Sequence, residues 1–189
     1  MFLFFRFLLP LLFLTHFLYA DEMTSNKQKS LEAIKELGSS LKSSLQMAMK
    51  ESGPIAALEY CNVAAQDITK ELSDTLQLKV RRTSLKTRNK NNIPDDWEQK
   101  SLSVFTAQYI SGEEIKNMYF HEIVTTNNND RIYRFIKPIP TGKVCLTCHG
   151  SNISSELADK IKELYPNDKA TGFKAGEIRG AFSVIVTLD

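Results

Sequence analysis

The sequence has few of the residues that mark several common protein classes. Its 189 residues include three cysteines, eight glycines and one tryptophan, and its 24 Lys and Arg residues nearly balance 22 Asp and Glu residues. Three cysteines are too few for a disulfide-dense miniprotein, and eight glycines are too few for a collagen. The balanced charge excludes a disordered acidic tail, and it lacks the basic excess that nucleic-acid binding needs. We therefore expect a globular protein without a nucleic-acid partner.

Common catalytic patterns are missing as well. The sequence contains no internal repeat, no Gly-rich phosphate loop, no Ser/His/Asp set and no carboxylate cluster suited to a metal ion.

No second long apolar run follows residue 20. We therefore expect the remainder to be soluble, or tethered only at its N terminus.

Apolar residues concentrate at the N terminus. Six of the 11 phenylalanines lie within residues 1–20, where Arg6 precedes an apolar run that ends near Ala20. This pattern is typical of a secretory signal peptide. A retained membrane anchor is the alternative, but Pro10 interrupts a run shorter than the roughly 20 apolar residues that a spanning helix needs. We predict a signal peptide at 1–20, export to the periplasm, and one domain at 21–189, whose net charge falls from +2 to +1 without Arg6.

The hydrophobic pattern predicts an α+β fold. Apolar residues at helical spacing indicate one helix over 24–49 and, after a break at Gly53 and Pro54, a second helix to about residue 72. The later elements expected are strands over 76–84, 119–126, 131–138 and 179–188, and helices that begin after Asp95 and at Ser154. Asp95 and Glu98 are spaced as a capping box, and residues 127–130 predict a hairpin between the second and third of these strands. The sum is two N-terminal helices followed by an antiparallel sheet with helical insertions.

Both N-terminal helices carry an apolar face. The first face contains Leu31, Ile34, Leu41, Leu45 and Ala48. It can pack on the rest of the domain, which is the default, or pair two copies in a homodimer. The second face contains Leu58, Cys61, Ala65, Ile68 and Leu72, so we expect Cys61 to be buried.

The strongest chemical signal is the C-x-x-C-H sequence that begins at Cys145. Cys145 and Cys148 are spaced to add to the two vinyl groups of one haem, and His149 can then reach the iron. Attachment of this kind occurs outside the bacterial cytoplasm, where a signal peptide would direct the chain. The motif therefore predicts one covalently attached haem c.

Three other uses of the motif are weighed against haem. Cys145, Cys148 and His149 could bind zinc with one distant ligand, the two cysteines could act as a redox dithiol, or they could form a plain disulfide. A thioredoxin-like dithiol would require a strand before the motif and a helix that starts within it. We expect a loop over 138–142 instead, so haem is favoured.

The second axial position of the iron stays open on the sequence alone. It can be empty or filled by His, Met or Cys. The candidates are His121, Met23, Met47, Met49, Met118 and Cys61. A helical Met or a buried Cys is more often a packing residue, and Cys61 is favoured only slightly over His121.

Several separated stretches resemble one family. Residues 56–68, 82–89, 92–98, 145–150, 165–173 and 176–180 are similar, in order, to the Tll0287-like haem family, formerly DUF3365. The resemblance implies a PAS-like sensor fold with one c-type haem. It also implies an axial pair made of His149 and Cys61. A thiolate ligand favours ferric iron, so reduction could weaken the iron–sulfur bond and open a site for a diatomic gas.

These observations lead to functional expectations. Arg82 and Arg88 are candidates to bind the haem propionates, because guanidinium pairs with carboxylate, although a solvated charged face is an equal alternative. We expect a redox or gas sensor, with a periplasmic electron-transfer cytochrome as the alternative. A small peroxidase that uses His121 ranks last. The expected partner is a redox or signalling protein, and a membrane is involved only if the leader is retained.

Overall fold

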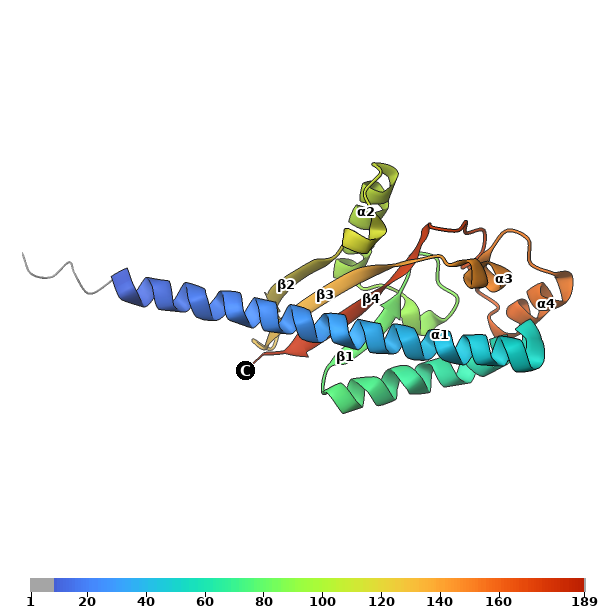
Figure 1. Ribbon diagram of the computed structural model, residues 1–189, viewed down its shortest axis with the longest axis horizontal. Helices are drawn as coiled ribbons and strands as arrows, with labels where there is room; N and C mark the ends of the chain where they lie inside the picture. Colours follow the sequence, from blue (N-terminus) through green and yellow to red (C-terminus); the bar gives the residue numbers. More distant parts are fainter. Residues whose placement is uncertain (1–8, 189) are drawn as a thin grey trace, which may run out of the picture.

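A bent helix and a four-stranded sheet form the framework of the computed structural model (Figure 1). The structure describes the backbone of residues 9–188 and the side chains of residues 21–188. The main elements are α1 (Leu9–Leu76), β1 (Lys79–Thr83), α2 (Asp96–Ile110), β2 (Phe120–Thr125), β3 (Arg131–Pro140), α3 (Leu146–His149), α4 (Ser155–Leu164) and β4 (Ile178–Thr187). Three short 3₁₀ turns, Lys90–Asn92, Ile115–Asn117 and Lys143–Cys145, lie in the connections.

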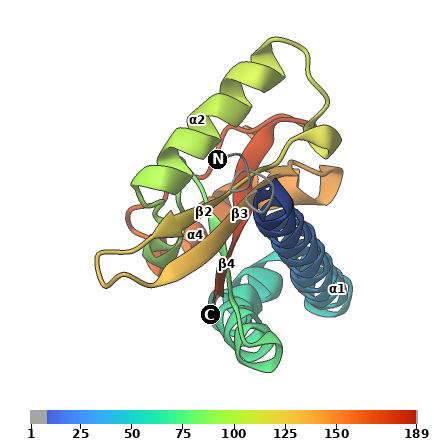
Figure 2. The same cartoon turned by 90° about the vertical axis from the view of Figure 1, so that its left-hand side faces the viewer.

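The helix α1 consists of two arms joined by a sharp bend. Gly53 has φ 79° and ψ −178°, a conformation that is readily open only to glycine. Pro54 follows and suits the first turn of the second arm because that position needs no backbone N–H. The two arms run side by side, and the bend lies at the same end of the molecule as α3 and α4 (Figures 1 and 2). The predicted break between two N-terminal helices is confirmed.

The sheet has the strand order β1-β4-β3-β2, and every neighbouring pair is antiparallel. The predicted hairpin around the asparagines at 127–129 joins β2 to β3. The α+β class, the antiparallel sheet and the helical insertions are confirmed. One boundary is wrong, because the expected loop over 138–142 begins as strand: β3 continues to Pro140.

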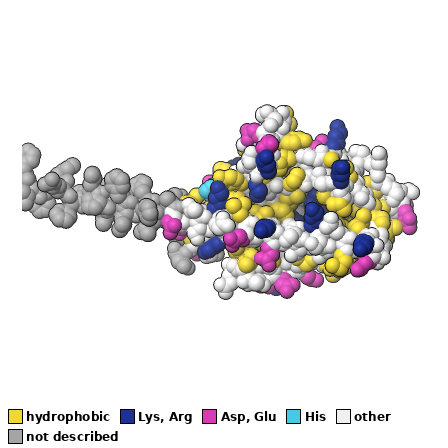
Figure 3. Space-filling view, in the orientation of Figure 1, with side chains coloured by type: hydrophobic (Ala, Val, Ile, Leu, Met, Phe, Trp, Pro, Cys, Tyr) yellow, Lys and Arg dark blue, Asp and Glu magenta, His cyan; other side chains and the backbone are white. Residues whose placement is uncertain are grey.

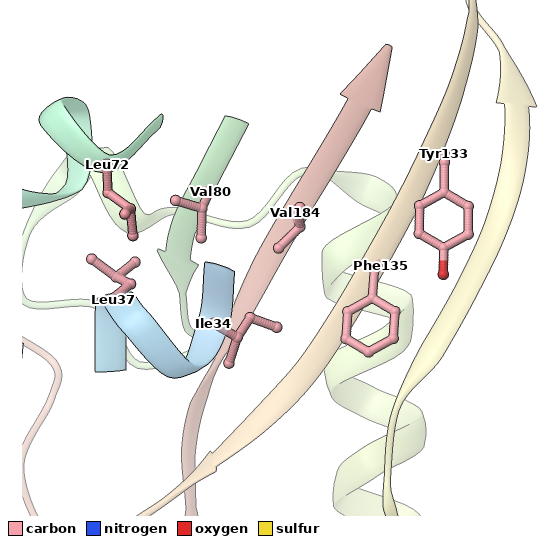
Figure 4. Packing of buried hydrophobic residues seen from close by; sticks show 7 residues of the cluster. All are labelled: Ile34, Leu37, Leu72, Val80, Tyr133, Phe135 and Val184. Atoms are coloured by element: carbon pink, nitrogen blue, oxygen red, sulfur yellow. The ribbon is translucent and has the colours of Figure 1, made fainter. Parts of the chain in front are cut away.

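The arms of α1 cover one face of the sheet. Ile34 and Leu37 from the first arm and Leu72 from the second pack against Val80 and Val184 of the sheet (Figure 4). Leu37, which falls outside the predicted stripe, is fully buried, whereas Leu45 and Ala48 within that stripe are only half-buried. The first arm is therefore held by the sheet mainly through its middle turns.

The helix α2 covers the opposite face of the sheet (Figure 2). The predicted capping box is present: Asp95 accepts a hydrogen bond from the Glu98 N–H, and Glu98 accepts one from the Asp95 N–H. Glu98 is fully buried, and Arg134 lies 4.0 Å from it and 2.6 Å from Asp95. Charged groups thus fix the start of α2 on the sheet.

The predicted signal peptide falls mostly outside this description. The structure begins its account of the backbone at Leu9 and of side chains at Asp21. Within the described part of the chain, no helix is both long enough and apolar enough to cross a membrane. Basic and acidic side chains are intermixed on the face seen in Figure 3.

Replacing Asp95 with Asn should reduce stability at neutral pH but not in acid. Burial raises the pKa of Asp95, but its hydrogen bonds with the Glu98 N–H and with Arg134 outweigh burial and lower that pKa overall. The ion pair therefore stabilises the fold fully above about pH 4, and the stabilisation is lost as the pH falls through the lowered pKa of the folded state. Urea unfolding at pH 7 should show a loss of about 0.5–1 kcal/mol.

The difference in unfolding free energy between the wild type and Asp95→Asn should disappear at acidic pH. Asp96→Asn is the matched control, since Asp96 forms no ion pair with the described residues. A difference in unfolding free energy between Asp95→Asn and the wild type that stays constant with pH would contradict this account.

Candidate functional site

The C-x-x-C-H motif forms two short helical turns directly after β3. The 3₁₀ turn Lys143–Cys145 runs into α3, which contains Cys148 and His149. Gly150 ends α3, and a Cβ atom there would lie 2.6 Å from the Leu146 carbonyl oxygen. A helix therefore begins within the motif, although it is only four residues long.

The ring of His149 is held by a backbone carbonyl. Its Nδ1 lies 2.7 Å from the carbonyl oxygen of Ala170. Burial lowers the pKa of His149 to about 3, and the positive charges of Arg179 and Arg88 reinforce the shift. The ring is therefore neutral near pH 7. Because a carbonyl can only accept, Nδ1 must donate, and the lone pair of Nε2 is left for a ligand.

A second segment, residues 168–173, holds the motif in place. The N–H of Phe173 donates to the carbonyl of His149 at 3.0 Å, and the N–H of Gly172 donates to the carbonyl of Gly150 at 3.1 Å. The ring of Phe173 also meets the ring of His149 edge-on, with centroids 6.3 Å apart. The orientation of the histidine thus depends on where this segment lies.

Arg88 ties the motif to the same segment. It forms a two-point ion pair with Asp168, with Nε–Oδ1 at 3.1 Å and Nη2–Oδ2 at 3.0 Å. Its Nη2 also donates to the Cys148 carbonyl at 2.6 Å. The side chains of Arg88 and Asp168 are only 10% and 8% exposed. The predicted propionate role of Arg88 stays a prediction, but these contacts already engage its Nε and Nη2.

Cys61 lies beside the motif, brought there by the bend in α1. Cys61 is close enough to Cys148, Arg82 and Tyr165 for the charges of these groups to interact. Burial raises the pKa of the Cys61 thiol, and Arg82 opposes that shift. Cys61 is half-buried, so it is less enclosed than its helix face predicts.

All three cysteines are free thiols. Cys148 packs against an apolar cluster of Leu58, Leu157 and Ile161, which joins the second arm of α1 to α4. Burial raises the pKa of the Cys148 thiol, whereas Arg88 lowers it. The motif and the second arm therefore share one small core.

Two further arginines face this cluster of thiols. Arg82 has a buried Nε without a hydrogen-bond partner among the described residues, and the same holds for Arg179. Burial lowers the pKa of both guanidinium groups, and each arginine is close enough to a cysteine for their charges to interact. Arg81, one residue from Arg82, instead pairs with Glu98 at 3.5 Å. Sequence analysis missed Arg179 because it stands alone in a strand.

The other candidate axial ligands lie elsewhere. His121, on β2, packs against the rings of Tyr119, Tyr133 and Phe135, and it pairs with Phe135 in the middle of β3, whereas the motif follows the end of β3. The four candidate methionines lie away from the motif or pack elsewhere. Met23 packs against the core between α1 and the sheet, and Met118 is buried in the core between α2 and the sheet. Met49 is half-buried, and Met47 is 58% exposed. Of the residues weighed, Cys61 is the one brought to the motif.

The side chains do not form a ready-made metal cage. Within residues 21–188, no group of three or more His, Cys, Asp or Glu side chains is arranged to hold a metal ion.

Asp168→Asn should destabilise the motif and its surroundings. The substitution leaves Arg88 without its charge partner in a site where both side chains are nearly enclosed. Breaking such a pair from one side costs about 3–5 kcal/mol. Chemical denaturation should detect the loss, and hydrogen exchange should show faster exchange of the N–H groups of residues 150 and 172–173.

Asp74→Asn is the control for this prediction. Asp74 pairs with Lys70 at 2.6 Å, but the two side chains are 66% and 77% exposed. Its loss should cost no more than about 0.5 kcal/mol. Equal costs for the two variants would contradict a structural role for the Arg88–Asp168 pair.

Comparisons with known proteins identify the family of the chain and a structure with a similar fold. A family model described as Tll0287-like matches residues 16–187. The crystal structure of the cyanobacterial haem protein Tll0287 is similar, with a TM-score of 0.66 and 20% sequence identity over 87% of this chain and 96% of that chain. At that identity, the likeness shows the fold alone. No curated protein sequence matches the chain. Because the family model spans nearly the whole chain, this protein belongs to the Tll0287-like family.

Proposed function

We propose that this protein carries one c-type haem and acts as a redox or gas sensor. The observation that carries the proposal is the meeting of Cys145, Cys148, His149 and Cys61 at one end of the domain. A C-x-x-C-H sequence is the attachment motif of haem c, and the family to which the chain belongs has a haem protein among its structural relatives.

The residues present fit a haem. Two free thiols of the motif are available for thioether bonds, and the neutral ring of His149 offers Nε2 as a ligand. The buried, unpartnered Nε of Arg82 can donate to a propionate carboxylate. The site therefore offers covalent attachment, an axial ligand and a counter-charge.

The protein's own residues set the axial ligands. The Ala170 carbonyl fixes the ring of His149 through Nδ1 and makes Nε2 a better ligand. Cys61 is the proposed second ligand, which requires loss of its proton. Arg82 favours that loss, against the effect of burial. Haem held by these residues would supply an iron centre able to change oxidation state and to bind a diatomic gas.

The cellular setting is part of the proposal. A signal peptide at 1–20 would export the chain to the periplasm, where haem c is attached. The partner would then be a redox or signalling protein. A single domain over 21–189 would serve as its sensing unit.

Cys61→Ser should change the ligation of the iron without preventing haem attachment. We expect protein matured in a host that attaches haem c to show a low-spin ferric spectrum with a thiolate signature, and Cys61→Ser to lose that signature. Optical spectra of the ferric and ferrous forms measure this, and a pyridine haemochrome assay shows that haem is still bound. His121→Asn is the control and should leave both spectra unchanged.

The same samples separate a sensor from an electron carrier. A sensor should release Cys61 on reduction, so the ferrous wild type should bind CO readily. An electron carrier should keep both ligands in both oxidation states and resist CO. Identical ferric spectra for Cys61→Ser and the wild type would remove Cys61 from the iron and contradict the proposed ligand pair.

A further inference from the structure

Three arginines lie near the C-x-x-C-H motif or near Cys61, and they are not equivalent. Arg88 is neutralised by Asp168 and bonded to the Cys148 carbonyl. Neither Arg82 nor Arg179 forms an ion pair with the described residues, and each has a buried Nε without a partner. Two buried positive charges are therefore left without a carboxylate.

Such charges are costly to bury. An ionised side chain removed from water strongly destabilises the fold unless a partner compensates its charge. Arg82 has one long contact, from Nη2 to the Ala65 carbonyl at 3.5 Å, and its charge is further disfavoured by the nearby Arg179. The fold keeps both arginines although nothing among the described residues neutralises them.

The position of Arg179 depends on a close crossing of two strands. It precedes Gly180 in β4, where a Cβ atom would overlap the carbonyl oxygen of Thr83 at the end of β1. The Ser84 hydroxyl donates to the Arg179 carbonyl at 2.7 Å and fixes the backbone there. Arg179 lies close enough to Cys145 for their charges to interact. A thioether carries no ionisable proton, so attachment of haem through Cys145 would leave no charge there to balance the guanidinium.

We propose that Arg179 and Arg82 together bind the carboxylate groups of the haem, and that Arg88 only positions the motif. This inference rests on the proposed function. Haem carries two propionate carboxylates, which match the two uncompensated guanidinium groups in number and in sign. Arg179 is thereby a haem-binding residue that the motif and its spacing do not reveal.

Arg179→Gln in the haem-loaded protein tests the assignment. A carboxylate paired with arginine has a pKa lowered by about 1–3 units. Loss of Arg179 should therefore move the pH dependence of the reduction potential upward by at least about one pH unit. The propionate bending bands of the resonance Raman spectrum should shift as well. Arg179→Lys, which keeps the charge, should restore most of the pH dependence, and Arg82→Gln should act in the same direction as Arg179→Gln.

Arg131→Gln is the matched control. Arg131 lies on β3 and pairs with Glu22 on the surface at 3.1 Å, so its loss should leave the Raman bands and the pH dependence unchanged. Shifts no larger than those of Arg131→Gln in all the Arg179 and Arg82 variants, with haem still attached, would overturn this inference alone. A wild type that carries no haem by pyridine haemochrome assay would overturn the proposed function, and this inference with it.

Discussion

The arrangement of the site depends on the buried ion pair between Arg88 and Asp168. It joins the chain just after β1 to the 168–173 segment, and the same guanidinium reaches the carbonyl of Cys148. The 168–173 segment in turn supplies the Ala170 carbonyl that orients His149. An ion pair this enclosed is strongly destabilising to break from one side, because the remaining charge stays buried. One pair therefore controls both the position of the motif and the tautomer of its histidine.

A second constraint, the bend in α1, places the thiol of Cys61 at the site. The second arm of α1 reaches the motif only because the chain reverses at Gly53, where a positive φ is tolerated. After the reversal, Leu58 packs with Leu157 and Ile161, and Cys61 follows one turn later. The large sheet core lies farther along the arms, around Leu37. The site therefore lies at the end of the domain and is supported by a smaller core of its own.

Much of the fold could be predicted from local signals. The Gly53 and Pro54 break, the capping box at Asp95 and the hairpin at 127–129 each act through neighbouring residues, so the sequence reveals them. The motif was identified for the same reason. Arg179 and the pairing of Arg88 could not be predicted, because both depend on contacts between segments far apart in the chain. The proximity of Cys61 to the motif is also such a contact, and it was expected only through the family resemblance.

The central claim is that Cys145 and Cys148 attach one haem covalently. The most direct measurement is the intact mass of the purified, denatured protein, produced with the haem c attachment machinery, for the wild type and for a Cys145→Ala, Cys148→Ala double variant. The account predicts that the wild type retains the mass of one haem after denaturation and that the double variant does not. A wild type without the added mass, or a double variant that keeps it, would contradict the account.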